Sequence, residues 1–214
     1  MTYSVREIYY TLQGEGARTG QPAVFLRFAG CNLWSGRERH RAGAVCRFCD
    51  TAFVGTGGPG GGKFATAAAL AAAVANAWPA GNAHRSRYVV CTGGEPLLQL
   101  DAAAIEALHA AGFEVGVETN GTIAAPPGID WLCVSPKGSA RLAQTSGDEL
   151  KLVYPQSEEA AQPERFESLE FGHFYLQPLD DDRREANTRA TIDYCLAHPR
   201  WRLSLQTHKL LGID

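Results

Sequence analysis

Three cysteines near the start of the chain, Cys31, Cys46 and Cys49, have the residue type and the spacing to hold an iron–sulfur cluster. Such clusters are bound through cysteine thiolates. Three thiolates would leave one iron of a cubane cluster without a protein ligand, whereas structural zinc takes four protein ligands. The C-x14-C-x2-C frame therefore predicts a cluster with an open corner, where an exchangeable ligand can bind.

A second motif, Thr92-Gly93-Gly94-Glu95-Pro96, follows about forty residues later. It comes directly after the apolar run 88–91, which is typical of a buried parallel strand. Glycines at the carboxyl end of such a strand let the backbone approach a ligand closely. Glu95 could then accept a hydrogen bond from a ligand ammonium group. Taken alone, Gly-Gly is typical of an ordinary turn.

Together and in this order, the cysteine frame and the Gly-Gly-Glu strand end resemble the radical S-adenosylmethionine (SAM) enzymes. The usual spacing there is C-x3-C-x2-C, so the long first spacer is a departure. With Leu12-Gln13-Gly14-Glu15-Gly16 before it and Cys49-Asp50-Thr51 after it, the chain resembles the 7-carboxy-7-deazaguanine synthase family. The resemblance covers nearly the whole chain, because it extends through the motifs at 118–121, 135–137, 177–178 and 206–209.

This resemblance implies a ring-contracting lyase of 7-deazapurine (queuosine-type) biosynthesis. The reaction would convert 6-carboxy-5,6,7,8-tetrahydropterin to 7-carboxy-7-deazaguanine with loss of ammonia. The implied cofactors are a [4Fe-4S] cluster, SAM and Mg²⁺. The radical would be generated from SAM at the cluster, so no catalytic side chain is assigned. The implied partners are the pterin substrate, an electron donor such as flavodoxin, and a second copy of the chain in a homodimer.

The resemblance also implies which residues bind each ligand. Cys31, Cys46 and Cys49 would hold the cluster, and Thr51 would place its hydroxyl on the magnesium ion. The implied SAM-binding residues are Phe48, Cys49, Asp50, Gly94, Glu95, Ser135, Pro136, Lys137, Gln177, Pro178, Leu179 and Asp180. The implied substrate-binding residues are Leu12, Gln13, Gly14, Glu15, Arg27, Thr92, Glu118, His208 and Asp214.

Taken without the resemblance, several of these residues also fit plainer roles. Phe48 could pack in the core, and Arg27 could be a solvent-exposed strand arginine. Asp50-Thr51 is typical of a helix cap. A lone histidine such as His208 is common on surfaces, and a chain end such as Asp214 is often frayed.

Length and charge narrow the classes of function. A chain of 214 residues with 45% hydrophobic residues predicts one domain over 1–214, with a cluster-loop insertion at about 32–45. The net charge of -3 supplies no basic field for nucleic acid or an anionic membrane. The first residues do not have the pattern of a secretory signal, and apolar runs of membrane-spanning length are missing. We therefore expect a cytoplasmic protein with reduced cysteines, in which Cys91, Cys133 and Cys195 are buried apolar residues.

Apolar runs alternate with helical segments, which predicts an α/β fold with a parallel sheet. The resemblance narrows this to a partial (β/α)6-type barrel, a trimmed radical SAM core. Candidate strands are Ala23 to Phe28, Arg87 to Cys91, Phe113 to Glu118, Trp131 to Ser135, Leu150 to Tyr154, Phe174 to Gln177 and Arg202 to Gln206. Candidate helices are Lys63 to Trp78, Asp101 to Ala111, Ser157 to Glu167 and Glu185 to His198.

Local signals set some boundaries within this pattern. Asp101 is a candidate N-cap, Gly112 a candidate C-terminal cap, and Pro79 ends the alanine-rich helix. The connections near 119–129 and 137–149 have no helical pattern. The glycine-rich segment 55–62 lacks the P-loop pattern and is expected to be a flexible linker.

Two other functions stay open at this point. A glycyl-radical activase also uses radical SAM chemistry, but that class has the short cysteine spacing. A zinc-binding interaction module could use His40 as a fourth ligand beside the three cysteines. Seven candidate strands are more scaffold than a zinc module requires.

Overall fold

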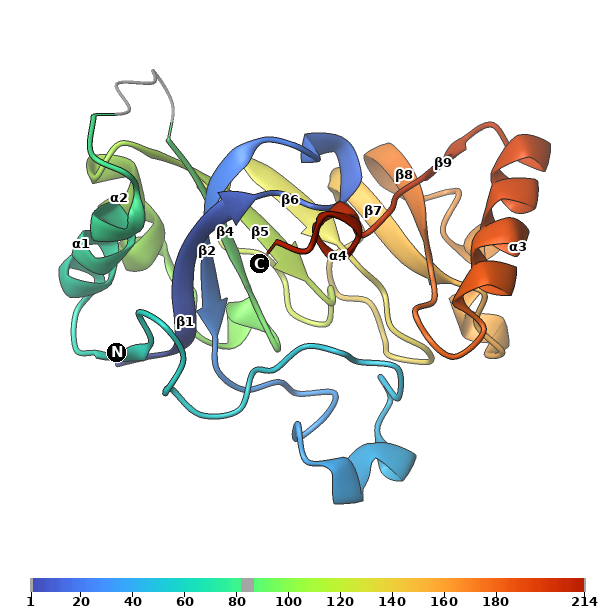
Figure 1. Cartoon of the computed structure of the whole chain (residues 1–214), viewed down its shortest axis with the longest axis horizontal. Helices are drawn as coiled ribbons and strands as arrows, with labels where there is room; N and C mark the ends of the chain where they lie inside the picture. The colour runs from blue at the N-terminus through green and yellow to red at the C-terminus, as the bar shows by residue number, and fades with distance from the viewer. Residues whose placement is uncertain (1, 82–86, 214) are drawn as a thin grey trace.

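One curved sheet forms the centre of the computed structural model, which describes residues 2–81 and 87–213 (Figure 1). Over these residues the sheet has nine strands in the order β3-β1-β2-β4-β5-β6-β7-β8-β9. Their bounds are β1 Tyr3–Leu12, β2 Pro22–Phe28, β3 Gly62–Phe64, β4 Arg87–Gly93, β5 Phe113–Thr119, β6 Trp131–Val134, β7 Ser146–Tyr154, β8 Glu170–Pro178 and β9 Trp201–Leu203.

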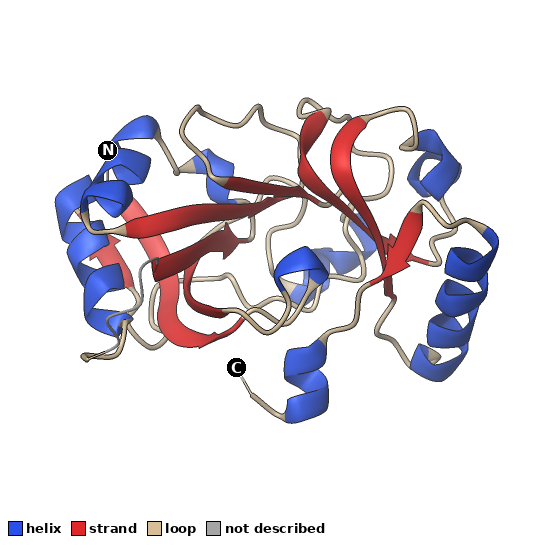
Figure 2. Cartoon of the chain, turned by 90° about the horizontal axis from the view of Figure 1, so that it is seen from above, coloured by secondary structure: helices blue, strands red, loops and turns tan. Residues whose placement is uncertain are grey.

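Four α-helices and several short 3-10 turns are described beside the sheet. The helices are α1 Ala67–Ala77, α2 Ala102–Ala110, α3 Arg184–Ala197 and α4 Thr207–Leu211. The pair α1 and α2 lies at one end of the curved sheet and α3 at the other, while α4 crosses its open side (Figures 1 and 2). The cysteine-containing connection between β2 and β3 extends away from the rest of the chain.

Strands are present at all seven predicted places, and they are the parallel part of the sheet, β2 and β4 to β9. The last of them, predicted at Arg202 to Gln206, is shorter and runs from Trp201 to Leu203. The predicted partial barrel is thus confirmed as a mixed α/β fold with a large, mostly parallel sheet. Prediction missed β1 and β3, which pair antiparallel at one edge. The register of β1 shifts between Val5 and Glu7, and such an irregularity interrupts the alternation by which a strand is recognised.

Two helix predictions need correction, and one helix was not predicted. The segment Ser157 to Glu167 is not an α-helix but holds two 3-10 turns, Glu159–Ala161 and Pro163–Arg165, because Pro163 interrupts the helical ladder. The first predicted helix begins at Ala67 instead of Lys63, since 62–64 joins the sheet and Thr66 provides the cap. Prediction also missed α4, which has five residues. The two connections without a helical pattern contain no helix in the described structure, as expected.

The glycine-rich segment 55–62 is bound to the sheet and is not a free linker. Ile8 N donates to Pro59 O at 2.8 Å, and Gly58 N donates to Arg6 O at 3.0 Å. A Cβ on Gly61 would lie 2.3 Å from Arg6 O. The glycines are therefore needed because the segment runs against the backbone of β1.

Strand alternation separates an outer core from an inner face that carries the polar residues. On β2, Val24, Leu26 and Phe28 belong to the main core under the helices. The alternate residue Phe25 belongs to a small inner cluster with Tyr88 and Val90 of β4. Successive side chains point to opposite faces. Polar residues at inner positions of the parallel strands consequently face the same interior.

No α-helix in the described ranges is long and apolar enough to cross a lipid bilayer.

Replacing Asp101 with alanine should lower the free energy of unfolding by about 2 kcal/mol. Its carboxylate caps α2 by accepting from Ala104 N at 3.0 Å, and it also accepts from the Tyr3 hydroxyl at 2.7 Å. Thr66 is a matched control, because it caps α1 with one bond from Ala69 N. Thr66→Ala should lose about 1 kcal/mol in chemical denaturation. Equal losses in the two variants would contradict a role for the bond from Tyr3.

Candidate active site

A cavity of about 430 Å³ lies on the inner side of the sheet, at the carboxyl ends of the parallel strands. Open α/β sheets bind ligands at this edge. Twenty-one of the residues singled out in the sequence line it: Leu12, Gln13, Gly14, Glu15, Arg27, Cys31, Cys46, Phe48, Cys49, Asp50, Thr51, Thr92, Gly94, Glu118, Ser135, Lys137, Gln177, Pro178, Leu179, Asp180 and His208. Residues distant in the sequence thus share one cavity.

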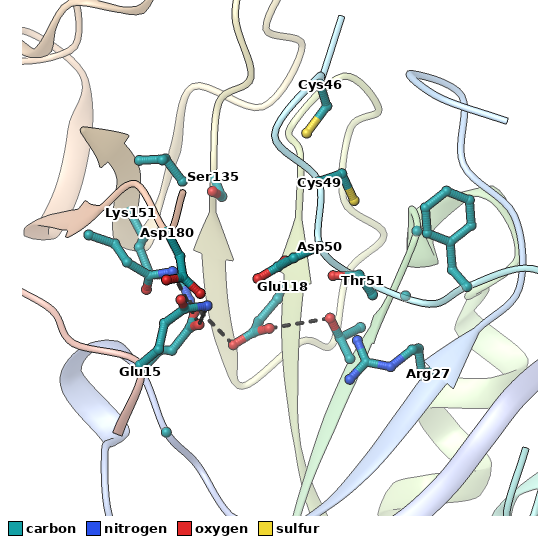
Figure 3. A pocket seen from close by; sticks show the side chains of 18 of the residues that line it. Glu15, Arg27, Cys46, Cys49, Asp50, Thr51, Glu118, Ser135, Lys151 and Asp180 are labelled. Carbon is teal, nitrogen blue, oxygen red and sulfur yellow. Dashed lines mark hydrogen bonds and ion pairs between the residues drawn. The ribbon is translucent and has the colours of Figure 1, made fainter. Parts of the chain in front are cut away.

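All three cysteines line this cavity, and Cys46 and Cys49 lie at the end opposite Glu15 and Lys151 (Figure 3). The Cys46 thiol donates a hydrogen bond to Cys49, which holds the pKa of Cys49 at about 6 against the effect of burial. Burial raises the pKa of Cys31, although the backbone N–H of Leu33 donates to its sulfur at 3.4 Å. These thiols have apolar neighbours that include Trp34 and Phe53.

The Gly93-Gly94 strand end touches the first cysteine segment. A Cβ on Gly94 would lie 2.1 Å from Gly30 O and 2.7 Å from Cys31 Cβ, and Glu95 N donates to Gly30 O at 2.9 Å. In this structure the close approach expected at the glycines is therefore made by the cysteine segment. The contact fixes Cys31 beside the end of β4.

Glu95 lies behind the cavity wall and is fully buried. Its carboxylate accepts hydrogen bonds from Leu97 N at 2.9 Å, the Thr119 hydroxyl at 2.7 Å and Asn120 N at 2.8 Å. Burial raises its pKa, and these donors oppose that effect. Its binding of a ligand ammonium group stays a prediction. The bonds seen here hold the ends of β4 and β5 together.

The far end of the cavity holds an ion pair that sequence analysis missed. Lys151 Nζ on β7 lies 2.5 Å from Glu15 Oε2 and 3.6 Å from Glu118 Oε1. Burial alone would raise the pKa of Glu15, but Lys151 and the amide of Gln206 hold it at about 2. The sequence does contain a sign of this pair, because Lys151 lies between two leucines in a predicted buried strand. An unpaired charge would be costly there, so a partner for the lysine could have been expected.

Arg27 lines the cavity from β2 but is already paired. Its Nε donates to Glu7 Oε1 at 2.8 Å, and Nη2 donates to the Tyr9 hydroxyl at 2.9 Å. Burial would lower the pKa of Arg27, while Tyr9 and Glu7 raise it. Arg27 is therefore a partly buried, paired cation and not the solvent-exposed arginine of the plainer interpretation.

The C-terminal segment closes the open side of the cavity. Thr207 N donates to Gly14 O at 3.0 Å, and a Cβ on Gly14 would lie 2.2 Å from the His208 ring. Lys209 Nζ lies 2.6 Å from both Asp50 Oδ2 and Asp180 Oδ2. One lysine therefore ties α4 to the cysteine loop and to the loop after β8.

Not every predicted site residue lines the cavity in the part of the chain that the structure describes. Pro136 is not among the cavity-lining residues, although its neighbours Ser135 and Lys137 line the wall and are hydrogen-bonded to each other. Asp214 lies outside the described residues, so its contact with substrate stays a prediction. Further lining residues that the prediction missed are Tyr9, Phe25, Asn120, Gln206 and Lys209.

Comparison with known proteins gives a consistent result. The chain is 66% identical to a 7-carboxy-7-deazaguanine synthase of Caulobacter vibrioides, over all of both chains. It is 62% identical to the same enzyme of Bordetella pertussis, again over both full lengths. No protein-family model matches the chain.

The chain belongs to the 7-carboxy-7-deazaguanine synthase family. A crystal structure of QueE from Escherichia coli superposes with a TM-score of 0.72 at 29% identity, covering 96% of this chain and 94% of that one. The trimmed radical SAM barrel predicted from the sequence is therefore the fold of this chain.

The residues of this synthase-family chain fit a [4Fe-4S] cluster at the three cysteines. Their sulfurs are near one another, Cys31 and Cys49 accept backbone N–H bonds, and the Lys137 ammonium acts on Cys46 and Cys49. Within the described residues, no three His, Cys, Asp or Glu side chains are grouped as ligands of a single metal ion.

The alternative zinc site with His40 is not formed here. His40 Nδ1 lies 2.8 Å from Ser35 Oγ, and its Nε2 accepts from Arg39 Nε at 3.2 Å. The ring is thus engaged by exposed neighbours within its own loop. Full-length similarity to the synthases likewise argues against a glycyl-radical activase.

Gly94→Ala should destabilise the protein by about 2 kcal/mol, because the added methyl would overlap backbone that has little room to shift. The displaced neighbour is Cys31, so iron and sulfide content after reconstitution should fall as well. Gly57→Ala is the matched control, since a Cβ there meets nothing within 4 Å. Full iron content in Gly94→Ala would show that the Gly94 contact does not position Cys31.

Glu95→Ala should lower the free energy of unfolding by about 3 kcal/mol, because three donors lose a charged acceptor. Urea denaturation of the cluster-free protein measures this without any ligand. Exposed Glu106 on α2 provides the control, and Glu106→Ala should stay within about 0.5 kcal/mol of wild type. A Glu95→Ala protein of wild-type stability would reject the structural role.

Proposed function

We propose that the chain converts 6-carboxy-5,6,7,8-tetrahydropterin to 7-carboxy-7-deazaguanine with loss of ammonia, as a radical SAM enzyme of 7-deazapurine biosynthesis. The observation that carries the proposal is that the cysteine frame opens into the same cavity as a charged, amide-lined floor, which consists of Gln13, Glu15, Glu118, Lys151 and Gln206. A ligand on the open iron and a second ligand on the floor would then lie side by side. Names of full-length relatives support the same reaction.

When bound, the cluster and SAM would supply a carbon-centred radical that takes a hydrogen atom from the substrate. Side chains of this chain would bind and orient the two ligands and keep water out. SAM would contact Phe48, Asp50, Gly94, the 135–137 strand end and the 177–180 segment. Gly94 and the 135–137 and 177–180 segments lie at the carboxyl ends of β4, β6 and β8, and Phe48 and Asp50 line the same cavity, which supports this assignment.

Opposite SAM, the pterin would lie between Arg27 and the floor. The guanidinium of Arg27 suits a carboxylate, because charged groups form strong paired hydrogen bonds. Glu15 and Glu118 suit ring N–H donors, while Gln13 supplies an amide. His208 and the chain end would cover the bound ring from the C-terminal side.

Magnesium would bind through the Thr51 hydroxyl and an oxygen of the substrate. Mg²⁺ takes oxygen ligands and keeps several waters, so one protein hydroxyl is a sufficient anchor. Thr51 lines the cavity next to Asp50 and on the same side as Arg27 (Figure 3). This places a hydroxyl near the position proposed for the substrate carboxylate.

Other parts of the proposal concern partners. An external reductant such as flavodoxin would deliver the electron to the cluster. A homodimer and a cytoplasmic location stay predictions made from the sequence.

The test is anaerobic incubation of reconstituted protein with SAM, dithionite, Mg²⁺ and 6-carboxy-tetrahydropterin, followed by mass spectrometry. We expect 7-carboxy-7-deazaguanine from the wild type and none from Cys46→Ala, which loses a cluster ligand. His40→Ala is the control and should retain its iron and activity. Cleavage of SAM with the pterin left unchanged would uphold the radical chemistry and reject this substrate.

A further inference from the structure

A lysine in the middle of a buried strand is the least expected residue of the cavity. Lys151 lies between Leu150 and Leu152, which are fully buried in the outer core. Strand alternation turns Lys151 to the inner face, where its side chain is 7% exposed. A buried ammonium is stable only when it is paired, so its partners indicate its role.

Four elements bring ionisable groups to this ammonium. Glu15 comes from the β1–β2 loop, Glu118 from β5, Glu149 from β7 itself and Cys133 from β6. Glu149 also accepts from Ala17 N at 2.9 Å and is close to Cys133 Sγ at 3.5 Å. One ammonium therefore faces three carboxylates at the end of the cavity.

The carboxylates at the cavity surface are nearly saturated by donors of this chain. Glu15 Oε1 accepts from the amides of Gln177 at 3.2 Å and Gln206 at 3.0 Å, while Oε2 accepts from Lys151. Glu118 accepts from Gln13 at 3.0 Å and from the Thr92 hydroxyl at 3.2 Å. An ionised carboxylate has about four acceptor positions, so few are left for a ligand and their direction is set.

The ammonium also favours the ionised form of Glu15. Neighbouring carboxylates without a cation repel each other, and one of them takes up a proton. A protonated carboxyl donates a hydrogen bond where the ionised form accepts one. Burial favours that protonated form at Glu15, and Lys151 is the strongest of the groups that oppose it and hold the pKa of Glu15 at about 2. His208 acts on Glu15 in the same direction from the C-terminal side.

We propose that Lys151 is a positioning and specificity-determining residue of the substrate site. It keeps Glu15 ionised and holds Glu15 and Glu118 directed into the cavity, so that their remaining acceptor positions select a heterocycle with adjacent N–H donors. The 2-aminopyrimidinone edge of a pterin has such donors. The choice of a pterin as ligand rests on the proposed function above, whereas the control of charge does not.

A double-mutant cycle with Lys151→Met and Glu15→Gln tests this inference through equilibrium binding of the pterin and of SAM to reconstituted protein. Lys151→Met should weaken pterin binding on the order of a hundredfold, the usual loss when one partner of a buried charge pair is removed. SAM affinity should stay within about twofold, because the lysine acts at the far end of the cavity from the cluster. Exposed Lys63 supplies the matched control, and Lys63→Met should bind both ligands as the wild type does.

The double variant distinguishes a lysine that acts through Glu15 from a lysine that contacts the pterin itself. If Lys151 acts through Glu15, the double variant should bind the pterin no more than about threefold more weakly than Glu15→Gln alone. The neutral pair also restores the charge balance, which protects the fold of the double variant. The proposal would be overturned if the losses of pterin affinity in the two single variants multiplied in the double variant. It would also be overturned if Lys151→Met bound the pterin as tightly as the wild type does.

A second measurement needs neither cluster nor pterin, so it stands even if the wild type forms no product. Glutamate carboxyl-¹³C NMR can follow Glu15, whose signal is assigned by its loss in Glu15→Gln. We expect Glu15 to stay ionised between about pH 7 and pH 5 in the wild type and to take up a proton there in Lys151→Met. An ionised Glu15 over that whole range in the variant would refute control of charge by Lys151.

Discussion

The buried ammonium of Lys151 is the interaction on which the substrate end of the cavity depends. Its partners belong to the β1–β2 loop, β5 and β7, which are far apart in the sequence but adjacent on the inner face. A hydrophobic replacement would leave several carboxylates facing one another at low solvent exposure. That arrangement would favour protonation of one carboxylate, or displacement of the loop that carries Glu15. The charge of Lys151 therefore influences both where the carboxylates of the floor lie and whether they accept or donate hydrogen bonds.

The opposite end of the cavity depends on sterics instead of charge. Absence of a side chain at Gly94 lets the end of β4 lie against Gly30 and Cys31, and the buried carboxylate of Glu95 holds the same strand end to β5. Lys209 then joins the cysteine loop to the loop after β8 through Asp50 and Asp180. The cluster segment is thus attached to both sides of the sheet although it is a long excursion from it.

Much of the site could be predicted because its motifs stand at strand ends. Apolar runs identified the seven parallel strands, and residues that follow such runs share one edge of the sheet. Lys151 was missed because it lies inside a run, where the pattern indicates core. The β1 strand and α4 were missed because an irregular register and a five-residue length leave little periodic signal. The helix expected at 157–167 failed at Pro163.

The sequence by itself determined the cysteine frame, the parallel α/β class and the membership of a synthase family, because these depend on residue type, spacing and local periodicity. Tertiary structure decided which carboxylate faces a ligand and which is structural. Glu15 and Glu118 reach the cavity, whereas Glu95 turns inward to three donors of its own chain. It also decided that Lys151 pairs with Glu15, 136 residues away. Such pairings are set by which strands become neighbours, and a linear pattern contains no distance between strands.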